Sequence, residues 1–459
     1  MKQKLPNLLR RGKGLLLAFA AATMAISHAQ AQDKVKVNNF YYYLNAENKT
    51  AELAPTEETT AYATGRLVIP GSINYEGETY SVDVIGDYAF SFCDGITSVS
   101  IPSSVKRIGN GAFQGCKKIN TVSFMMSTVE EIGDAAFEGC ETIGSITLPA
   151  TLKKLGDWAF AGCTGLRTGN IPAGVEHLGK NVYMRCTGMS VAAIRCQLTE
   201  MPDGMFDHCT SLTKITMADS IKNNIRRIGV GTFYDCPKLT TFAFGDSVAK
   251  IDACGFMGCT GLGKVTLPES VKHIGHDAFS ACQKMSEINI PANVDSIGDH
   301  AFKDAHALKQ ITMSDSVKYL GEQAFAYCQN LTSAKISKNI KEIRFKTFAG
   351  CTKLTDFTLS PNITIIADSA FQGVKCFDTL KLSNLNSVGD YAFADCGKLK
   401  YVYMPEKLRK IGNYTFKGDS IEQYYVEWTS APAIKSGYFT YCDTLFIPEG
   451  TSYKFRTGW

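Results

Sequence analysis

Three groups of side chains in this chain of 459 residues have types that carry chemistry. His273, His276 and His300 are close in sequence, and imidazoles bind metals or transfer protons. The 16 cysteines could form disulfides or hold zinc. Glu130 and Glu131 are adjacent carboxylates, a type that acid–base catalysis uses in pairs. The elements that position these residues decide which of these roles is open to them.

A repeat with a period of about 23 residues organises almost the whole chain. The segment I-G-x-x-A-F-x-x-C recurs in sixteen copies, and twelve of the fifteen intervals between them are 23 residues long. A fixed period in this range predicts a solenoid, in which each copy is one coil packed on its neighbours. The repeat aromatics are Phe90, Phe113, Phe137, Phe160, Tyr183, Phe206, Phe233, Phe256, Phe279, Phe302, Phe325, Phe348, Phe371, Phe393, Phe416 and Phe439.

Each copy predicts the same short elements. The residues nine and eleven after the aromatic are apolar, as in Val99 and Ile101, and this alternation is typical of a short β-strand. A proline such as Pro102 closes the strand, because proline cannot donate to a continuing ladder. A second apolar pair, such as Val105 and Ile108, leads through a glycine into the aromatic turn. We expect coils of strand, turn, extended segment and tight turn, stacked about 4.8 Å apart.

The repeat gives most cysteines a structural explanation. Thirteen stand three residues after the aromatic, in a slot that holds Ala305 and Val374 in two other copies. Such a slot is a small buried apolar position, and free cysteine behaves as a small hydrophobe. Cys196, Cys254 and Cys376 lie outside the column and are better candidates for a disulfide or an exposed thiol. We expect buried thiols at Cys93, Cys116, Cys140, Cys163, Cys186, Cys209, Cys236, Cys259, Cys282, Cys328, Cys351, Cys396 and Cys442.

The other reactive groups also have simple explanations. No C-x-x-C pair occurs, and ligands on one line cannot surround a zinc ion, so we expect no metal site. His273 and His276 occupy slots that hold Arg107 and Asn110 elsewhere, which favours ordinary solvated surface. The paired carboxylates fall at variable turn positions, and no nucleophile elbow, P-loop or dinucleotide fingerprint occurs in the required context. We therefore expect a non-catalytic protein with no cofactor.

Residues 1–31 have the features of a secretory signal peptide. They combine a basic start, an apolar stretch over 15–26 and small residues at Ala29 and Ala31, which predicts cleavage after Ala31. The apolar stretch is too short to span a membrane, and no later segment could do so. The leader carries five of the 48 basic residues, so the mature chain has 43 against 44 acidic residues. This balance makes nucleic acid and anionic membranes poor partners.

The chain divides into four expected parts. After the leader, residues 32–84 are expected to form an N-terminal cap with a divergent first repeat, 85–445 the solenoid and 446–459 a C-terminal cap. Residues 67–70 and 445–448 imitate the repeat strand, and residues 75–78 predict a turn. Asp419 occupies the cysteine slot, which suggests that the last coils are looser or more exposed.

The outward positions of the stacked strands are the candidate ligand-binding surface, because their chemistry can vary from coil to coil. They are uncharged over the first half, as at Thr97 and Ser98, although Thr and Ser also simply suit strands. Residues 223–227 add a basic bulge, which is either a loop insertion or a contact site. The candidate ligand-binding residues further along are Lys214, Lys264, Lys309, Lys335, Lys381, Tyr401 and Tyr403.

The pattern I-G-x-x-A-F-x-x-C-x-x-L-x-x-I-x-I-P-x-x-V over about residues 67–448 resembles the BspA-like leucine-rich repeats of bacterial surface proteins. The segment from Tyr80 to Phe90 is also similar to the opening of such secreted proteins from gut or oral Bacteroidetes. The resemblance implies a right-handed, curved leucine-rich-repeat solenoid of about 16 coils of about 23 residues, with a parallel β-sheet on its concave face.

The resemblance also implies a function, but it carries over no particular ligand. Members are regarded as adhesins or ligand-binding surface proteins, so we expect a secreted or cell-surface protein that binds an extracellular protein or glycan. The alternative is a glycan-binding surface protein that captures polysaccharide through the C-terminal aromatics, although these residues also suit cap packing. They are Tyr403, Tyr414, Tyr424, Tyr425, Trp428, Tyr438 and Tyr441. A spacer without a ligand is a third possibility, and the oligomeric state stays open.

Overall fold

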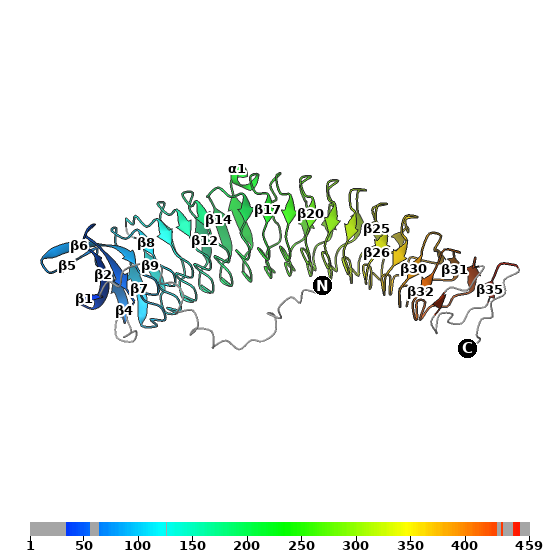
Figure 1. Cartoon of the computed structure of the whole chain (residues 1–459), viewed down its shortest axis with the longest axis horizontal. Coiled ribbons are helices and arrows are strands. Elements are labelled where there is room, and N and C mark those ends of the chain that lie inside the picture. The colour runs from blue at the N-terminus through cyan, green and yellow to red at the C-terminus, as the bar shows by residue number, and fades with distance from the viewer. Residues whose placement is uncertain (1–33, 56–63, 125, 429–432, 435–443, 450–459) are drawn as a thin grey trace.

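The computed structural model describes residues 34–55, 64–124, 126–428, 433–434 and 444–449. These residues form a β-solenoid of about fifteen turns, bent into an arch with β1 (Val35–Val37) at one end and β35 (Thr444–Phe446) at the other (Figure 1). The repeat aromatics from Phe90 to Phe416 lie within the described residues, and one per turn points into the core. The predicted signal peptide lies outside the described residues.

In most coils a strand follows the aromatic, and these strands, with β4 ahead of Phe90, form a parallel row, here called ladder A. Its strands pair in register one repeat apart, as Thr168 with Val191 and Val191 with Lys214. The row is divided into five sheets rather than one continuous sheet. Its strands are β4 (Gly65–Val68), β7 (Ile96–Ser100), β9 (Thr121–Ser123), β12 (Thr168–Ile171), β14 (Val191–Ile194), β16 (Lys214–Met217), β19 (Lys264–Val265), β21 (Glu287–Ile288), β23 (Gln310–Thr312), β25 (Ser333–Lys335), β27 (Asp356–Phe357), β29 (Thr379–Lys381), β31 (Tyr401–Met404), β33 (Gln423–Val426) and β35.

The short extended segment of each coil forms a second parallel row, ladder B. Its outward residues alternate in charge in places, and Glu131 pairs with Lys154 of the next coil at 2.7 Å. Its strands of two residues are β8 (Arg107–Ile108), β10 (Glu131–Ile132), β11 (Lys154–Leu155), β13 (His177–Leu178), β15 (Glu200–Met201), β17 (Arg227–Ile228), β18 (Lys250–Ile251), β20 (His273–Ile274), β22 (Ser296–Ile297), β24 (Tyr319–Leu320), β26 (Glu342–Ile343), β28 (Ile365–Ile366), β30 (Ser387–Val388), β32 (Lys410–Ile411) and β34 (Ala433–Ile434).

The aromatic turn contributes a third row of bonds between coils. The backbone N–H of Phe113 donates to the carbonyl of Ala136 at 2.8 Å, and Gly111 donates to Asp134 at 2.8 Å. This bonding requires a left-handed backbone two residues before the aromatic, where Gly111 has φ 56° and Ala135 has φ 54°. The buried rings stack along the axis with centroids 5.2 to 6.0 Å apart in most steps, so one apolar core runs through the solenoid.

A row of Asp and Asn side chains also links successive coils. Asp87 Oδ1 accepts the N–H of Asn110 at 2.9 Å, Asn110 Oδ1 accepts that of Asp134 at 2.8 Å, and Asp134 Oδ1 accepts that of Asp157 at 2.9 Å. Each side chain therefore satisfies a backbone donor that the turn leaves unpaired. This explains why I-G-D recurs, a signal that the sequence analysis did not use.

The N-terminal end closes the first coil with antiparallel strands. β1 pairs with β2 (Phe40–Asn45), β2 with β3 (Thr50–Ala54), and β3 runs parallel to β6 (Glu78–Ile85), whose end opens ladder B. β5 (Ser72–Tyr75) and β6 form a hairpin with positive φ at Glu76 and Gly77, which confirms the predicted turn. The strand predicted over residues 67–70 is partly confirmed by β4, which pairs with β7. We propose that these strands cap the solenoid against edge-to-edge association.

The described residues around Asp419 are closely packed, contrary to the suggestion that this residue marks looser or more exposed coils. Its side chain is buried, with 7% of the residue exposed, and burial raises the pKa of its carboxyl to about 7. Tyr424 and Trp428 are also buried, and Trp428 donates its indole N–H to the Pro405 carbonyl at 3.0 Å. The strand expected over 445–448 is partly confirmed, because β35 pairs with β33.

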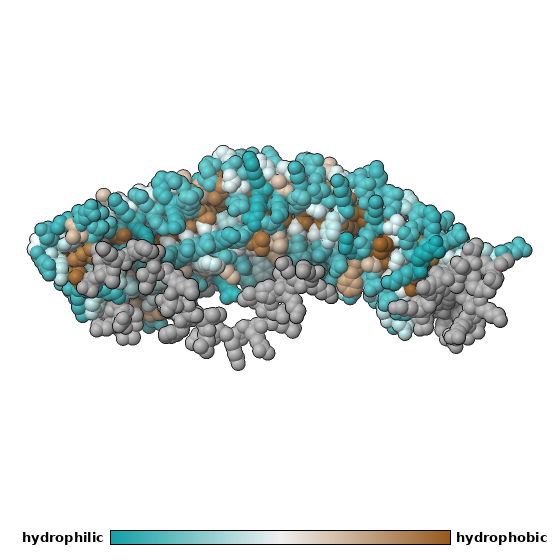
Figure 2. Space-filling model, in the orientation of Figure 1, coloured by the Kyte–Doolittle hydropathy of each residue, from teal (hydrophilic) through white to brown (hydrophobic). Residues whose placement is uncertain are grey.

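Within the described residues there is one helix, the single turn α1 (Asp219–Lys222), and it lies in the 27-residue coil. No helix in the described part of the chain is long and apolar enough to cross a membrane. The visible face of the molecule is mainly hydrophilic, with only small apolar areas between the coils (Figure 2).

Candidate functional site

The outward side chains of ladder A, here called the strand face, carry the residues that the sequence marked as candidates. The coil register places them in rows that run along the solenoid. Lys214, Lys264 and Tyr401 begin their strands, Lys335 and Lys381 end theirs, and Lys309 directly precedes β23. With coils about 4.8 Å apart, the lysines extend over about 34 Å of the strand face rather than forming one cluster.

The lysines are exposed but sit among carboxylates. Lys264 forms an ion pair with Glu287 on the next strand at 2.9 Å. Asp356 lies in the same row and accepts a hydrogen bond from the Ser333 hydroxyl at 2.7 Å. Lys381 lies over the ring of Tyr403 at 5.6 Å. The strand face is therefore mixed in charge, which suits a polar ligand better than a uniform polyanion.

Three aromatic rings form a stack at the C-terminal end of the strand face. Tyr403 and Tyr425 lie 4.3 Å apart at 4°, and Tyr425 and Phe446 lie 4.6 Å apart at 4°. Lys381 lies over the face of Tyr403 that is turned toward the earlier coils. Because the rings cover one another's faces, the stack offers ring edges and hydroxyl groups to the outside.

Tyr401 has a different environment from Tyr403. Its hydroxyl donates to Glu422 at 3.1 Å, and Glu422 also pairs with Lys400 at 2.6 Å. Tyr414 belongs to another row, where it stacks on Tyr391 at 5.2 Å. The C-terminal aromatics therefore separate into a partly exposed stack, a buried group and a turn pair. Tyr438 and Tyr441, which were expected to take part, lie outside the described residues.

The column of buried thiols is confirmed for its twelve described members, and Cys442 lies outside the described residues. The Cys116 thiol donates to the carbonyl of Phe90 in the preceding coil at 2.9 Å, and burial raises its pKa to about 12. Cys196, Cys254 and Cys376 are unbridged, Cys196 is buried, and the other two are partly exposed. The twelve described thiols of the column therefore act as core side chains.

The insertion in the 27-residue coil combines buried isoleucines with an arginine held by ion pairs. Ile221 of α1 and Ile225 are buried beneath it. Arg227 reaches across the outer side of ladder B and is held by ion pairs from several coils. The carboxylates around its guanidinium are Glu200, Asp203 and Asp252. These partners neutralise the charge of Arg227, whereas Arg226 of the same bulge is exposed.

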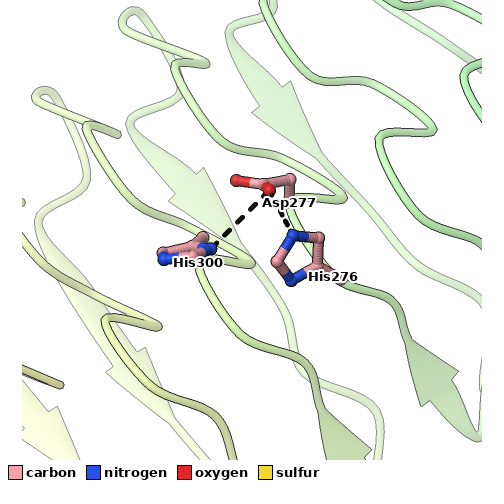
Figure 3. Close-up of side chains that lie close together, drawn as sticks. All are labelled: His276, Asp277 and His300. Carbon is pink, nitrogen blue, oxygen red and sulfur yellow. Dashed lines mark ion pairs between the residues drawn. The ribbon is translucent and has the colours of Figure 1, made fainter. Parts of the chain in front are cut away.

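The structure separates the three histidines. His273 pairs with Asp295 at 2.9 Å on the outer side of ladder B. His276 and His300 instead approach Asp277 on neighbouring aromatic turns (Figure 3). Asp277 was missed by the sequence analysis, although the 24-residue separation of the two histidines places them in adjacent columns of a 23-residue repeat.

Paired parallel ladders, short coils and a continuous apolar core define a leucine-rich-repeat solenoid. The family model for the BspA type leucine rich repeat region matches residues 124–225, 226–355 and 318–446. The chain therefore belongs to the BspA-type leucine-rich-repeat family.

Two solved structures of leucine-rich repeat proteins are similar to this chain. A leucine-rich repeat protein from Bacteroides ovatus is 26% identical, with a TM-score of 0.64, and the match covers 85% of this chain and 94% of that one. A leucine rich cell surface protein from Faecalibacterium prausnitzii is 22% identical, with a TM-score of 0.47 over 88% of this chain and 96% of that one. Among curated proteins, none matches the chain.

Proposed function

We propose that this protein is exported, is displayed at the cell surface and binds a host or microbial macromolecule through the strand face, as an adhesin. The observation that carries the proposal is the strand face itself, where rows of outward side chains change from hydroxyls to lysines and tyrosines along the stack. The signal-like leader and the family assignment support it. The side chains of the strand face suit recognition rather than bond cleavage, which is consistent with a non-catalytic role.

The proposed mechanism is multivalent contact. Each coil adds one or two side chains, so a long ligand meets many weak sites whose effects combine. Exposed lysines give modest individual attraction that salt weakens. The carboxylates between them favour a protein with a mixed surface over a purely acidic polymer.

Polysaccharide capture is the second candidate function, and the aromatic stack is the observation that favours it. A sugar ring usually needs an open aromatic face, but Tyr403 and Tyr425 cover each other. Binding there would depend on hydroxyls and ring edges, which makes it weaker than an open platform.

The test is binding of the purified protein to an array of extracellular-matrix proteins and of host and microbial glycans, at low and high salt. Saturable binding to a protein that weakens with salt is expected. Salt-insensitive binding to a glycan, lost on substitution of Tyr401 and Tyr403 by alanine, would favour polysaccharide capture. A blank array would overturn both functions and favour the spacer, while leaving the fold assignment intact.

A further inference from the structure

His276, Asp277 and His300 meet on the outside of the aromatic turns. His276 and Asp277 follow β20, and His300 occupies the column of Asp277 one coil further on, after β22. The turn bonding fixes this juxtaposition, because the N–H of Asp277 donates to the carbonyl of Asp299 at 2.9 Å. Figure 3 shows both imidazoles directed toward the same carboxylate.

The distances are close to those of a metal site. His276 Nε2 lies 2.7 Å from Asp277 Oδ2, and His300 Nδ1 lies 3.7 Å from the same oxygen. One donor atom from each residue lies within 4.8 Å of the others. Zinc bonds of about 2.0 to 2.1 Å in tetrahedral geometry separate donors by about 3.3 Å. Small side-chain rotations would therefore bring all three onto one ion.

The surroundings shield two of the three donors and contact one of them through a hydrogen bond. The side chains of Asp277 and His300 are 16% and 26% exposed, whereas that of His276 is 50% exposed. The amide nitrogen of Gln323 lies 2.9 Å from His300 Nε2. A half-turn of this amide exchanges its nitrogen and oxygen, and the oxygen then accepts the Nε2 proton and leaves the Nδ1 lone pair for a metal, as outer ligands of metal sites do.

We propose that His276, Asp277 and His300 form a binding site for a divalent transition-metal ion of the zinc type. Two imidazoles and one carboxylate match the donors that zinc prefers, and they leave a coordination position for water or for a donor atom from a partner. The ion takes the place of the proton that His276 Nε2 shares with Asp277, and that proton leaves to water. The site lies apart from the strand face and does not depend on the proposed adhesin function.

The repeat supplies variants that keep the backbone. Asn110 occupies the column of His276, and Asn181 occupies the column of Asp277 and His300 with φ 55°. His276→Asn, Asp277→Asn and His300→Asn therefore remove ligands without opposing the local conformation. Ala135 occupies the column of Gln323 and has the same left-handed backbone, so Gln323→Ala is compatible with the local conformation. His273→Ser is the matched control, because Ser296 occupies its column.

The experiment is calorimetric titration of the purified protein, free of any polyhistidine tag, with zinc chloride, accompanied by cobalt absorption spectra. One equivalent of zinc is expected to bind to the original chain. We expect the affinity for zinc to fall at least tenfold in each ligand variant and about tenfold in Gln323→Ala, and to stay unchanged in His273→Ser. Circular dichroism and the unfolding midpoint of each variant show that it is folded.

Four results would overturn the proposal. The first is the absence of saturable binding by the unsubstituted protein. The second is binding by all ligand variants as tight as in the original chain, which would put the ion elsewhere. The third is a thiolate-to-cobalt charge-transfer band, which would assign the ion to cysteines. The fourth is an equal loss in His273→Ser, which would show only general binding by surface imidazoles.

Discussion

Cysteine in the repeat slot fills space and satisfies a backbone carbonyl at once. Cys163 is fully buried, and its thiol donates to the carbonyl of Phe137 at 3.1 Å. Cys163→Ala is expected to lower the free energy of unfolding by about 1 to 2 kcal/mol, through a small cavity and a lost weak hydrogen bond. Cys163→Asp should cost more, because it buries a carboxyl group. Denaturant titration checks the order, and equal losses would contradict a buried role for the slot.

Asp419 gives the chain a pH-dependent weakness. Burial raises its folded-state pKa to about 7 from an ordinary value of 3.8, so the folded chain holds a proton that the unfolded chain releases between these values. Its contribution to stability therefore falls as pH rises from about 4 to 7, and the full penalty applies above 7.

Replacement of Asp419 by asparagine tests this effect, because the amide keeps the shape and can still accept from Gly397. Asp419→Asn is expected to be more stable than the original chain at pH 8, by about 1 to 3 kcal/mol, with the difference vanishing near pH 4. Denaturant midpoints at the two pH values measure it. A difference that stays constant with pH would rule out titration of this carboxyl as its cause.

At the scale of elements, the Asp and Asn row predicts a distinction between amide and alkyl replacements. Asp134→Ala removes the acceptor of the Asp157 N–H, so we expect a loss of about 1 kcal/mol in the free energy of unfolding. Asp134→Asn should leave the free energy of unfolding nearly unchanged, because the Asn110 side chain accepts the equivalent hydrogen bond in the preceding coil. If thermal unfolding affects both variants alike, the side-chain acceptor does not stabilise the coil contact.

The elements that the sequence could predict are those with a pattern long enough to be specific. Alternation after the aromatic predicts ladder A, and Gly77 predicts the β5–β6 turn. Ladder B was expected only as extended chain, because strands of two residues such as β8 show no alternation. The helix α1 was missed because the inserted Asn and Arg residues hid the buried Ile221 and Ile225.

For the candidate site, the sequence could predict only which residues lie on the strand face, because that follows from the repeat register. The positions of Lys335 and Lys381 follow from counting residues after each aromatic. The stack of Tyr403, Tyr425 and Phe446 was missed as a unit, because the last coils depart from the regular spacing. Pairing of Lys264 with Glu287 also depends on side-chain conformations that a repeat pattern does not specify.

At the scale of the whole molecule, a solenoid is stabilised mainly by contacts between neighbouring coils. Coils near the ends have fewer neighbours to hold them, so local opening should be easiest there. Native-state hydrogen exchange is expected to be slowest in the ladder B segment from β17 to β24 and faster in β33 and β35. Uniform protection along the chain would indicate a single cooperative unit instead.

The central claim is that the strand face binds the partner, and the affinity of paired triple variants tests it most directly. Lys214, Lys264 and Lys309 are changed together to alanine on the strand face, and the control changes the exposed Lys272, Lys318 and Lys341 beside ladder B. With the protein ligand found on the array, we expect the first variant to bind about tenfold more weakly or worse and the control to bind as the original chain does. Equal affinities for the two variants would contradict binding through the strand face.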